Sequence, residues 1–511
     1  MPNRGAPTPP VELPERAGTR LNGTPVLVPS RVVSALAGTG ATVETDDTVL
    51  AEHGRDWWPL SIGWAVHDGQ VPTRPGVVVR AHTTEQVVGV LRIASAHRLP
   101  VTAMGGRSGV CGASLPVHGG IALDVCGLNG IVDVDEQSLT VDVMAGTFGD
   151  VFEDRLRAEH RLTLGHWPQS IALSTIGGWL ACRSAGQYST RYGKIEDMIR
   201  GIEVVLADGR VVRTGHRGPK EAAGPDLTQL FVGSEGTLGV ITRARLQVWP
   251  VPEVERRAAF GFASFPDGLE ACRLILRAGA TPAVLRLYDE RESARNFGTA
   301  KPGERGASNV LLVLDEGTPS IIDGGFAVVE SVCAHMNAAT HDPAYVERWL
   351  GHRNDVSQLE SVIRNDIVVD TIEIAAPWRT IARVHEEVTA ELLSIPGTMV
   401  ATCHQSHAYP DGACLYFTFA GRPPTTSTAP LDRDSYYRTV WDRATTATLG
   451  HGGTVSHHHG IGLNRGRFMR ATLGEGAFEM LCTLKSAYDP LGILNPGKLG
   501  LPDPFGAAVW P

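Results

Sequence analysis

The chain has 511 residues, of which 42% are hydrophobic and 20% charged, and its formal net charge is −9. This length predicts at least two domains. The negative net charge argues against a protein that binds nucleic acid or anionic membranes by general electrostatic attraction. The eight cysteines form no CxxC pair, so no thiolate zinc site is expected, and no apolar run reaches the ~18 residues of a bilayer span. The N-terminus has no apolar signal core, so the expected compartment is the cytoplasm.

An α+β unit is predicted over residues 70–250. A strand at 76–82 leads into an amphipathic helix at 84–98, for which Thr84 is the expected N-cap. A short strand at 99–104 then runs into a glycine-rich stretch. Later strands are expected at 121–125, 131–146, 202–215 with a hairpin turn at Ala207-Asp208-Gly209, and 237–250.

From about residue 251 the pattern changes. Helical stretches at 266–279 and 378–394 alternate with strand-like stretches at 309–317 and 413–421. This alternation predicts a second α+β domain. The polar, Pro/Thr-rich segment 421–432 is expected to form a surface loop, and 474–496 a helix followed by a closing tail.

Four glycine-rich segments stand out in the first unit, at 104–112, 168–193, 193–199 and 233–242. None contains the Walker pattern GxxxxGK[ST]. Glycine and small hydroxyl residues let backbone N–H groups converge on a diphosphate without a lysine, as in the run from Gly105 to Gly109. One such loop can be an ordinary tight turn, but four in one unit favour binding of a nucleotide cofactor.

These loops resemble the FAD domain of the vanillyl-alcohol-oxidase superfamily. Within that superfamily, the ordered motifs STIGGW, GSEGTLGVIT, LRLYD, DGACLYF and SHHHGIG resemble the alkylglycerone-phosphate synthase family, from about residue 55 to 500. The resemblance implies an α+β fold with a two-lobed PCMH-type FAD-binding domain and an α+β cap (substrate) domain built on an antiparallel sheet. The implied division is an N-terminal extension at 1–50, the FAD domain at 51–250, the cap domain at 251–470 and a C-terminal segment at 471–511 that packs back on the FAD domain.

The resemblance also implies which residues contact FAD. They are Gly105, Gly106, Arg107, Ser108, Gly109, Val110, Gln169, Ser170, Ile171, Ala172, Leu173, Ser174, Thr175, Cys182, Arg183, Ser184, Ala185, Glu235, Gly236, Thr237, Leu238, Gly239, Val240 and Ile241. Many superfamily members attach FAD covalently through a histidine just after the paired glycines of the first loop. Arg107 and Ser108 stand there in this chain, so the expected FAD is non-covalent.

The run His457-His458-His459 admits a metal-binding interpretation. D-2-hydroxy-acid dehydrogenases of the superfamily hold a metal with two histidines in an HxGDGNLH-like strand and a glutamate in a GEHGIG-like turn. The matching positions here are Tyr409, Tyr416 and His458, which lack the imidazoles and the carboxylate of such a site. In a strand, neighbouring side chains alternate faces, so at least one histidine is expected to point away. No metal is therefore expected.

The resemblance instead implies exchange of the acyl group of an acyl-dihydroxyacetone phosphate for a fatty alcohol, which forms an ether lipid precursor without net redox change. Imidazoles with pKa values near neutrality suit the proton transfers of this reaction. The implied catalytic residues are Tyr416 as proton donor to the leaving carboxylate, His457, His458 and His459 at the flavin face, and Arg286 as a supporting group. Structural roles remain open for each, including an ion pair of Arg286 with Asp289 or Glu290.

The substrate-binding arginine of the family precedes a segment that corresponds to 373–378 here. Arg364 is the assigned residue and Arg353 the other candidate, while His404 takes a position that is usually basic in the family. The alternative function is an FAD-dependent oxidoreductase of a 2-hydroxy acid or alcohol, and a non-catalytic flavin or metal-binding protein is a third. The expected partner is a small-molecule or lipid substrate and not nucleic acid, with peripheral membrane contact and a homodimer left open.

Overall fold

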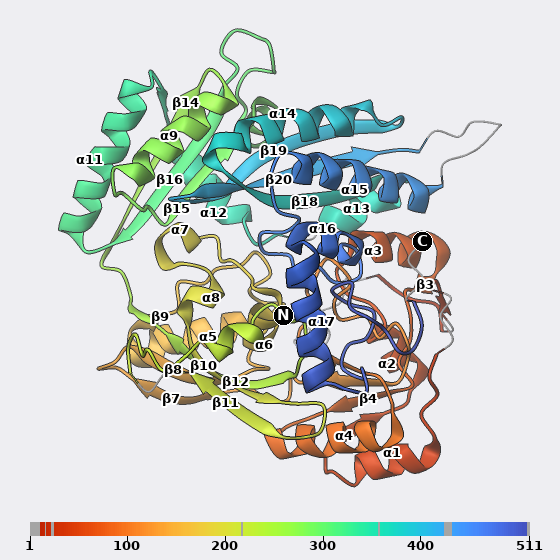
Figure 1. The fold of residues 1–511 in the computed structure, drawn as a ribbon. Coiled ribbons are helices and arrows are strands. Elements are labelled where there is room, and N and C mark those ends of the chain that lie inside the picture. The colour runs from red at the N-terminus through yellow and green to blue at the C-terminus, as the bar shows by residue number, and fades with distance from the viewer. Residues whose placement is uncertain are drawn as a thin grey trace.

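A computed structural model describes residues 11–15, 17–21, 25–215, 218–355, 358–423 and 432–507. The chain folds into two lobes, an N-terminal lobe and a cap lobe, and its last helix runs from their junction along the N-terminal lobe (Figure 1). No helix in these ranges combines the length and the apolar character that a bilayer crossing requires. The predicted loop at 421–432 lies largely outside the described residues.

The N-terminal lobe begins with a four-stranded sheet in which three neighbouring strands are parallel. In sheet order the strands are β2 (Thr42–Glu44), β4 (Val77–Arg80), β6 (Ile121–Asp124) and β5 (Val101–Met104). The three parallel strands are almost wholly buried because α1 (Ser30–Ala37) and α4 (Thr84–His97) cover one face and α2 (Asp47–Glu52) lies near the other, whereas the edge strand β2 is largely exposed. The predicted helix is confirmed, but its N-cap is Thr83, whose hydroxyl accepts the N–H of Gln86.

A second, antiparallel sheet completes this lobe. Its order is β11 (Val211–Gly215), β10 (Ile199–Val205), β12 (Val240–Gln247), β8 (Thr140–Met144) and β7 (Ile131–Asp135). The single strand predicted at 131–146 is therefore wrong. The chain turns back there because the Asp135 carboxylate accepts the N–H groups of Gln137 and Ser138. The turn predicted at Asp208-Gly209 is confirmed, with Gly209 at φ 81°.

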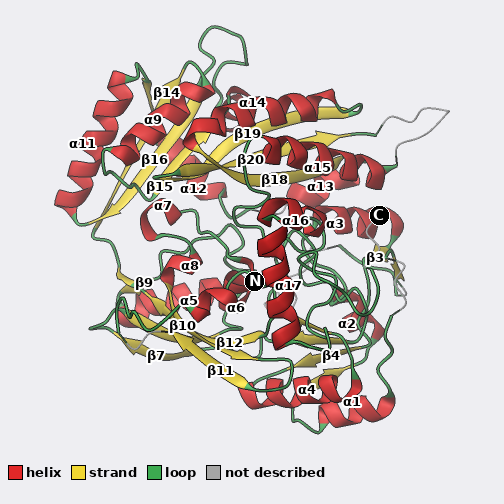
Figure 2. Cartoon of the chain, in the orientation of Figure 1, coloured by secondary structure: helices red, strands yellow, loops and turns green. Residues whose placement is uncertain are grey.

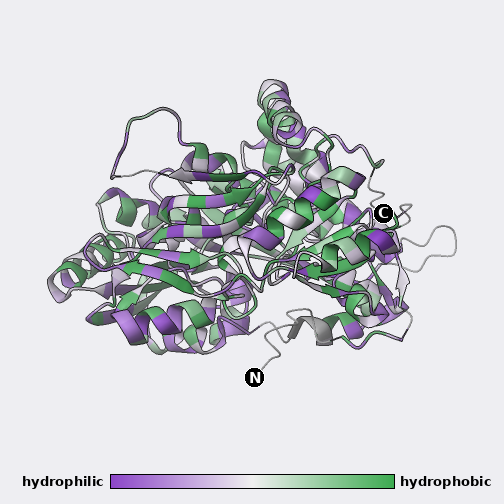
Figure 3. Cartoon of the chain, turned by 90° about the horizontal axis from the view of Figure 1, so that it is seen from below, coloured by the Kyte–Doolittle hydropathy of each residue, from purple (hydrophilic) through white to green (hydrophobic). Residues whose placement is uncertain are grey.

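The cap lobe is a seven-stranded antiparallel sheet whose outer face carries long helices (Figure 2). In sheet order its strands are β17 (Ala339–His341), β14 (Val254–Phe262), β16 (Asn309–Gly317), β15 (Val284–Tyr288), β19 (Thr398–Tyr409), β20 (Gly412–Gly421) and β18 (Val368–Pro377). The covering helices are α9 (Phe265–Arg277), α11 (Pro319–His335), α14 (Trp378–Ser394) and α15 (Arg433–Gly450). They bury the largest hydrophobic core, and Figure 3 shows hydrophobic residues on both the strands and the helices.

Shorter elements complete the two lobes. They are α3 (Pro59–Asp68), α5 (Gly149–Arg155), α6 (Ile176–Cys182), α7 (Ser189–Tyr192), α8 (Ile195–Met198), α10 (Glu290–Phe297), α12 (Ala344–His352) and α13 (Gln358–Arg364), with the two-stranded pairs β1 (Gly18–Thr19) with β3 (Gln70–Val71) and β9 (Leu162–Thr163) with β13 (Trp249–Pro250). Figure 1 shows α12 and α13 between the cap sheet and the N-terminal lobe.

The C-terminal segment contains α16 (Met469–Leu473) and α17 (Glu475–Tyr488). It contacts the N-terminal lobe through buried polar groups. The Lys485 ammonium donates to the Thr237 carbonyl at 2.9 Å, and the Lys498 ammonium donates to the Leu115 carbonyl at 2.8 Å. These bonds hold the end of the chain beside the glycine-rich loops.

Candidate active site

A cavity of about 850 Å³ lies between the two lobes. Its N-terminal side is lined by the glycine-rich loops, and its cap side by strands β15, β19 and β20, helix α12 and the histidine run. Segments far apart in the sequence therefore share one chamber. This position makes the cavity the candidate active site.

The first glycine loop follows β5 and forms part of the cavity wall. A Cβ atom at Gly105 would lie 2.3 Å from the Thr175 hydroxyl, and one at Gly106 would lie 1.9 Å from the Leu173 carbonyl. Only glycine fits at these two positions, whereas nothing lies within 4 Å of a Cβ at Gly109. The loop thus packs its backbone tightly against 173–175 and presents an open concave side, as a diphosphate cradle requires.

The structure brings most of the predicted cofactor residues to this wall. Those that line the cavity are Gly105, Gly106, Arg107, Ser108, Gly109, Val110, Gln169, Ser170, Leu173, Ser174, Thr175, Cys182, Ser184, Ala185, Glu235, Gly236, Gly239, Val240 and Ile241. Those that do not are Ile171, Ala172, Arg183, Thr237 and Leu238. Ile171 and Leu238 belong to the hydrophobic core, and the half-exposed Arg183 side chain points to Glu196, 3.7 Å away.

The histidine run is not a strand, so the alternation expected for it does not apply. Instead the backbone turns around the fully buried carboxylate of Glu373, on β18. This carboxylate accepts the N–H groups of all three histidines, at 3.2 Å for His458 and 2.9 Å for His459, and an Arg465 N–H at 2.8 Å. Wrapping the backbone around one anion directs neighbouring side chains outward into the site.

The next residues of the turn are held by a second buried carboxylate, that of Glu235 from the N-terminal lobe. It accepts the N–H of Ile461 at 2.6 Å and that of Gly462 at 2.8 Å. Gly462 has φ 54°, and a Cβ there would lie 2.2 Å from the Cys111 carbonyl, so glycine is required. The two lobes therefore accept hydrogen bonds from consecutive parts of the same turn.

Two of the three imidazoles face the cavity. His458 and His459 line it, while His457 lies behind them against His407 and Tyr409, with ring centroids 5.0 and 5.4 Å away. Burial, reinforced by the ammonium of Lys194, lowers the pKa of His457 to about 3, and burial lowers the pKa of His459 to about 4. The imidazoles are therefore neutral at pH 7 and can accept a proton, but they are weaker bases than the near-neutral imidazoles expected from the sequence.

Tyr416 lies next to these imidazoles on β20. Its hydroxyl accepts a hydrogen bond from Thr371 at 3.0 Å, and its ring stacks on that of His404 with centroids 4.9 Å apart. Burial raises the pKa of Tyr416, so the phenol keeps its proton at neutral pH. A protonated phenol and neutral imidazoles in one cavity supply a proton donor and proton acceptors.

Arg286 supports Tyr416 through His404. The Arg286 guanidinium lies 2.5 Å from His404 Nε2, and His404 Nδ1 lies 2.8 Å from the Glu292 carboxylate. Burial and the Arg286 charge lower the pKa of His404 to about 4, so the ring is neutral and donates from Nδ1 to Glu292. Arg286 also donates to the Tyr288 hydroxyl at 2.7 Å, and these contacts replace the ion pair with Asp289 or Glu290 that was an alternative.

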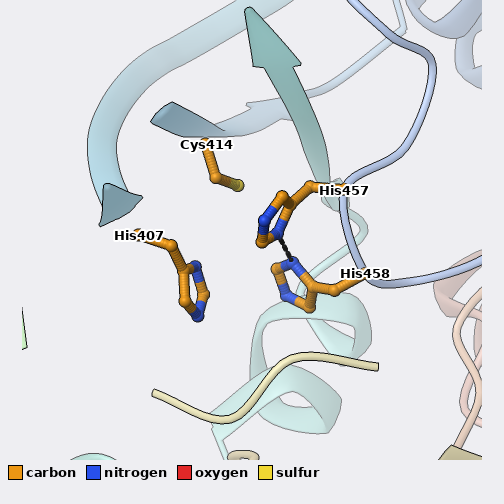
Figure 4. A group of neighbouring side chains, drawn as sticks. All are labelled: His407, Cys414, His457 and His458. Atoms are coloured by element: carbon orange, nitrogen blue, oxygen red, sulfur yellow. Dashed lines mark hydrogen bonds between the residues drawn. The ribbon is translucent and has the colours of Figure 1, made fainter. Parts of the chain in front are cut away.

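Four side chains at the cavity wall form the group that could ligate a metal in the described part of the chain (Figure 4). His407, Cys414, His457 and His458 have donor atoms that all lie within 4.8 Å of one another. His407 and Cys414 pair across the β19–β20 hairpin, which sequence reasoning missed because it aligned Tyr409 and Tyr416. The Nδ1 atoms of His457 and His458 are joined by a 2.9 Å hydrogen bond, which a metal would have to displace. The absence of a metal stays a prediction.

The cavity wall is rich in arginine. Arg286, Arg295, Arg348 and Arg353 line it, but Arg364 does not, since it lies exposed at the end of α13. The Arg353 guanidinium is surrounded by the rings of Trp167, Tyr188 and Trp349, with centroid distances of 5.5, 5.0 and 5.6 Å, and its Nη1 is buried without a partner. Sequence spacing alone could not choose between Arg353 and Arg364.

Known proteins resemble the chain over nearly its whole length. Residues 75–215 match the family model described as "FAD binding domain", and residues 251–499 match "FAD linked oxidases, C-terminal domain". An uncharacterized FAD-linked oxidoreductase of Escherichia coli K12, YgcU, is 30% identical over 472 residues, which cover 89% of this chain and 95% of the relative.

The chain belongs to the FAD-linked oxidase family. FAD is therefore its cofactor, and the glycine-rich wall fits it, because the loop at 105–109 leaves an open cradle and the buried Arg107 beside it has an unpartnered Nε. These residues would hold the FAD diphosphate.

Some other relatives of this flavoprotein are named as a synthase and others as an oxidase. Alkyldihydroxyacetonephosphate synthase of Trypanosoma brucei brucei is 29% identical, covering 86% of this chain and 75% of the relative, and glycolate oxidase subunit GlcD of Bacillus subtilis is 28% identical, covering 84% and 90%. Among solved structures, an alkyldihydroxyacetonephosphate synthase has a TM-score of 0.78 at 24% identity, covering 95% of this chain and 90% of that one. This likeness confirms the α+β fold expected from the sequence.

Proposed function

We propose that this flavoprotein exchanges the acyl group of an acyl-dihydroxyacetone phosphate for a fatty alcohol. One observation carries the proposal: a tyrosine–imidazole group and an arginine group line the same cavity of an FAD-linked oxidase. In the exchange, the bond between C1 and the ester oxygen breaks, a bond between C1 and the alcohol oxygen forms, and a fatty acid leaves. No net oxidation or reduction occurs.

The tyrosine–imidazole group supplies the proton transfers. A base must remove a proton from C1, next to the ketone, and a second transfer must take the proton of the incoming alcohol. The neutral imidazoles of His458 and His459 suit both steps, because buried histidines with lowered pKa values stay unprotonated at pH 7. The Tyr416 phenol keeps its proton at pH 7 and lies next to these imidazoles, so it can donate a hydrogen bond to the departing carboxylate.

The arginine group suits the phosphate. Arg353 has a buried Nη1 without a partner, and Arg348 and Arg286 line the same cavity. The planar guanidinium of arginine can donate two parallel hydrogen bonds to two oxygens of one phosphate. Aromatic rings around a guanidinium keep water away from it. We propose Arg353, in place of Arg364, as the phosphate-binding residue.

Bound FAD supplies the electrophilic ring on which a redox-neutral exchange of this kind depends. We propose that it is held without a covalent bond, because Arg107 and Ser108 follow the paired glycines of the first loop and neither is a histidine.

A second candidate function is oxidation of a 2-hydroxy acid. It is favoured by the His407–Cys414–His457–His458 group, whose nitrogen and sulfur donors suit a zinc-like ion that could polarise such a substrate. A relative named glycolate oxidase subunit at 28% identity agrees with it. Stoichiometric metal in the purified protein would favour this function.

The decisive experiment is anaerobic incubation with acyl-dihydroxyacetone phosphate and hexadecanol, with the ether product measured by mass spectrometry. We expect product from the wild-type protein, and none from Tyr416→Phe or His458→Ala, both with FAD still bound. Tyr409→Phe is the matched control, because Tyr409 lies on the same hairpin but outside the cavity and bonds to Ser189. Bleaching of the flavin by glycolate or D-lactate, with no ether product, would replace this function by the second one.

A further inference from the structure

Three arginines of the described chain are buried, and one of them differs from the others. Arg55 is 5% exposed and its guanidinium lies 2.6 Å from the Glu52 carboxylate. Arg465 is 1% exposed and lies 2.8 Å from Glu373. Arg107, also 5% exposed, makes no ion pair with any residue that the structure describes.

The surroundings of Arg107 offer its charge little compensation. Its Nε is buried without a partner, and its Nη1 contacts only the sulfur of Met104, at 4.0 Å. The nearby carboxylate of Asp124 accepts hydrogen bonds from Arg80 and from the Cys126 N–H, both at 2.8 Å. Burial accordingly lowers the pKa of Arg107. A buried cation without a counter-charge is unfavourable, so a folded chain normally pairs it.

Arg107 also occupies a particular place in the fold. It follows Gly105 and Gly106 in the loop after β5, has φ 52°, and lines the cavity. The fold therefore holds an unpaired cation where the backbone loop opens toward the cofactor. An anion delivered with the cofactor would supply the missing charge, and the anion of FAD is its diphosphate.

We propose that the Arg107 guanidinium is the counter-charge of the FAD diphosphate, so that its buried charge is compensated only when FAD is bound. A diphosphate gripped only by backbone N–H groups would not need this cation. Arg107 should therefore have two opposite effects. It lowers the stability of the flavin-free protein and raises the affinity of the protein for FAD. This inference does not depend on which reaction the enzyme performs.

The test uses Arg107→Met, which removes the charge but keeps an unbranched side chain. Arg183→Met is the matched control, because Arg183 also has a positive φ, 55°, in a cofactor motif but is absent from the cavity wall. FAD release from the holoprotein is followed by flavin fluorescence at several ionic strengths. We expect Arg107→Met to release FAD about 10- to 100-fold faster, with a weaker salt dependence, and Arg183→Met to match the wild type.

A second measurement separates the diphosphate from the rest of FAD. The full-length protein stripped of flavin is titrated with ADP, which carries the diphosphate, and with riboflavin, which has no phosphate. We expect Arg107→Met to weaken ADP binding, to leave riboflavin binding unchanged, and to raise the melting temperature of the stripped protein above that of the wild type. Equal losses for ADP and riboflavin, unchanged FAD release, or a lowered melting temperature of the stripped variant would each overturn the proposal.

Discussion

Two buried carboxylates hold the same turn from opposite lobes, and they differ in charge environment. Glu373, from the cap sheet, accepts the N–H groups of the histidine run and pairs with Arg465. Glu235, from the N-terminal lobe, accepts the N–H groups of Ile461 and Gly462 but has no ion pair among the described residues. Both use backbone donors, so the cation is the main difference between them.

This difference decides the ionisation of each group. Burial by itself raises the pKa of Glu373, but Arg465, the neighbouring histidines and the backbone donors lower it to about 2. For Glu235, burial raises the pKa and the backbone donors offset only part of that effect. A buried carboxylate is thus firmly ionised where a guanidinium joins the backbone N–H groups.

The largest effect is expected from Glu373→Gln. It leaves Arg465 buried without a carboxylate and turns an amide NH₂ toward backbone donors, so the free energy of unfolding should fall by about 3–5 kcal/mol. Urea denaturation followed by circular dichroism measures this change. Glu386→Gln, on the exposed face of α14, is the control and should stay within about 0.5 kcal/mol of the wild type. A loss from Glu373→Gln as small as that of the control would contradict the role of the pair.

A double variant tests whether the two charges act together. Arg465→Met alone removes the cation and should also destabilise the protein strongly, since Glu373 is left with only neutral donors, the N–H groups of the histidine run and the Ser456 hydroxyl. In Glu373→Gln/Arg465→Met no unpaired charge remains, so the double variant should lose less than the sum of the single variants, by about 0.5–3 kcal/mol. Strict additivity in the same denaturation experiment would mean that the pair is not coupled.

The pH dependence of stability should have opposite signs for the two carboxylates. Because the folded pKa of Glu373 is lowered from 4.5 to about 2, its stabilisation is complete above pH 4.5 and is lost as pH falls toward 2. Because the folded pKa of Glu235 is raised, its contribution declines as pH rises above 4.5. Between pH 7 and pH 3, the melting temperature of Glu373→Gln should fall less than that of the wild type. An equal fall in the two proteins would refute the lowered pKa of Glu373.

The smallest effect is expected from Glu235→Gln. The amide oxygen can still accept from Ile461 and Gly462, and no cation is left unpaired within the described structure, so the change should be about 1 kcal/mol or less. Chemical denaturation beside Glu373→Gln gives the comparison directly. If Glu235→Gln destabilises as much as Glu373→Gln, an ion pair is not what distinguishes the two sites.

Much of the fold could be predicted because local patterns were strong. The strand at 309–317 and the helix at 378–394 have the predicted bounds, since apolar periodicity and capping are short-range signals. The hairpin at 131–144 was missed because a polar four-residue turn was taken as continued alternation. The histidine run was taken as a strand, although the carboxylate that shapes it lies 84 to 86 residues away in the sequence.

The sequence by itself determined the α+β class and the glycine loops that can hold an anion, because these depend on neighbours along the chain, and its resemblance to a known family indicated FAD and the residues that face it. Only the tertiary structure decided that Glu373 and Glu235 share one turn, that Arg353 and not Arg364 reaches the cavity, and that Arg107 is buried unpaired. Each of these contacts depends on how the two lobes and their sheets pack against each other, and a local sequence pattern carries no information about that packing.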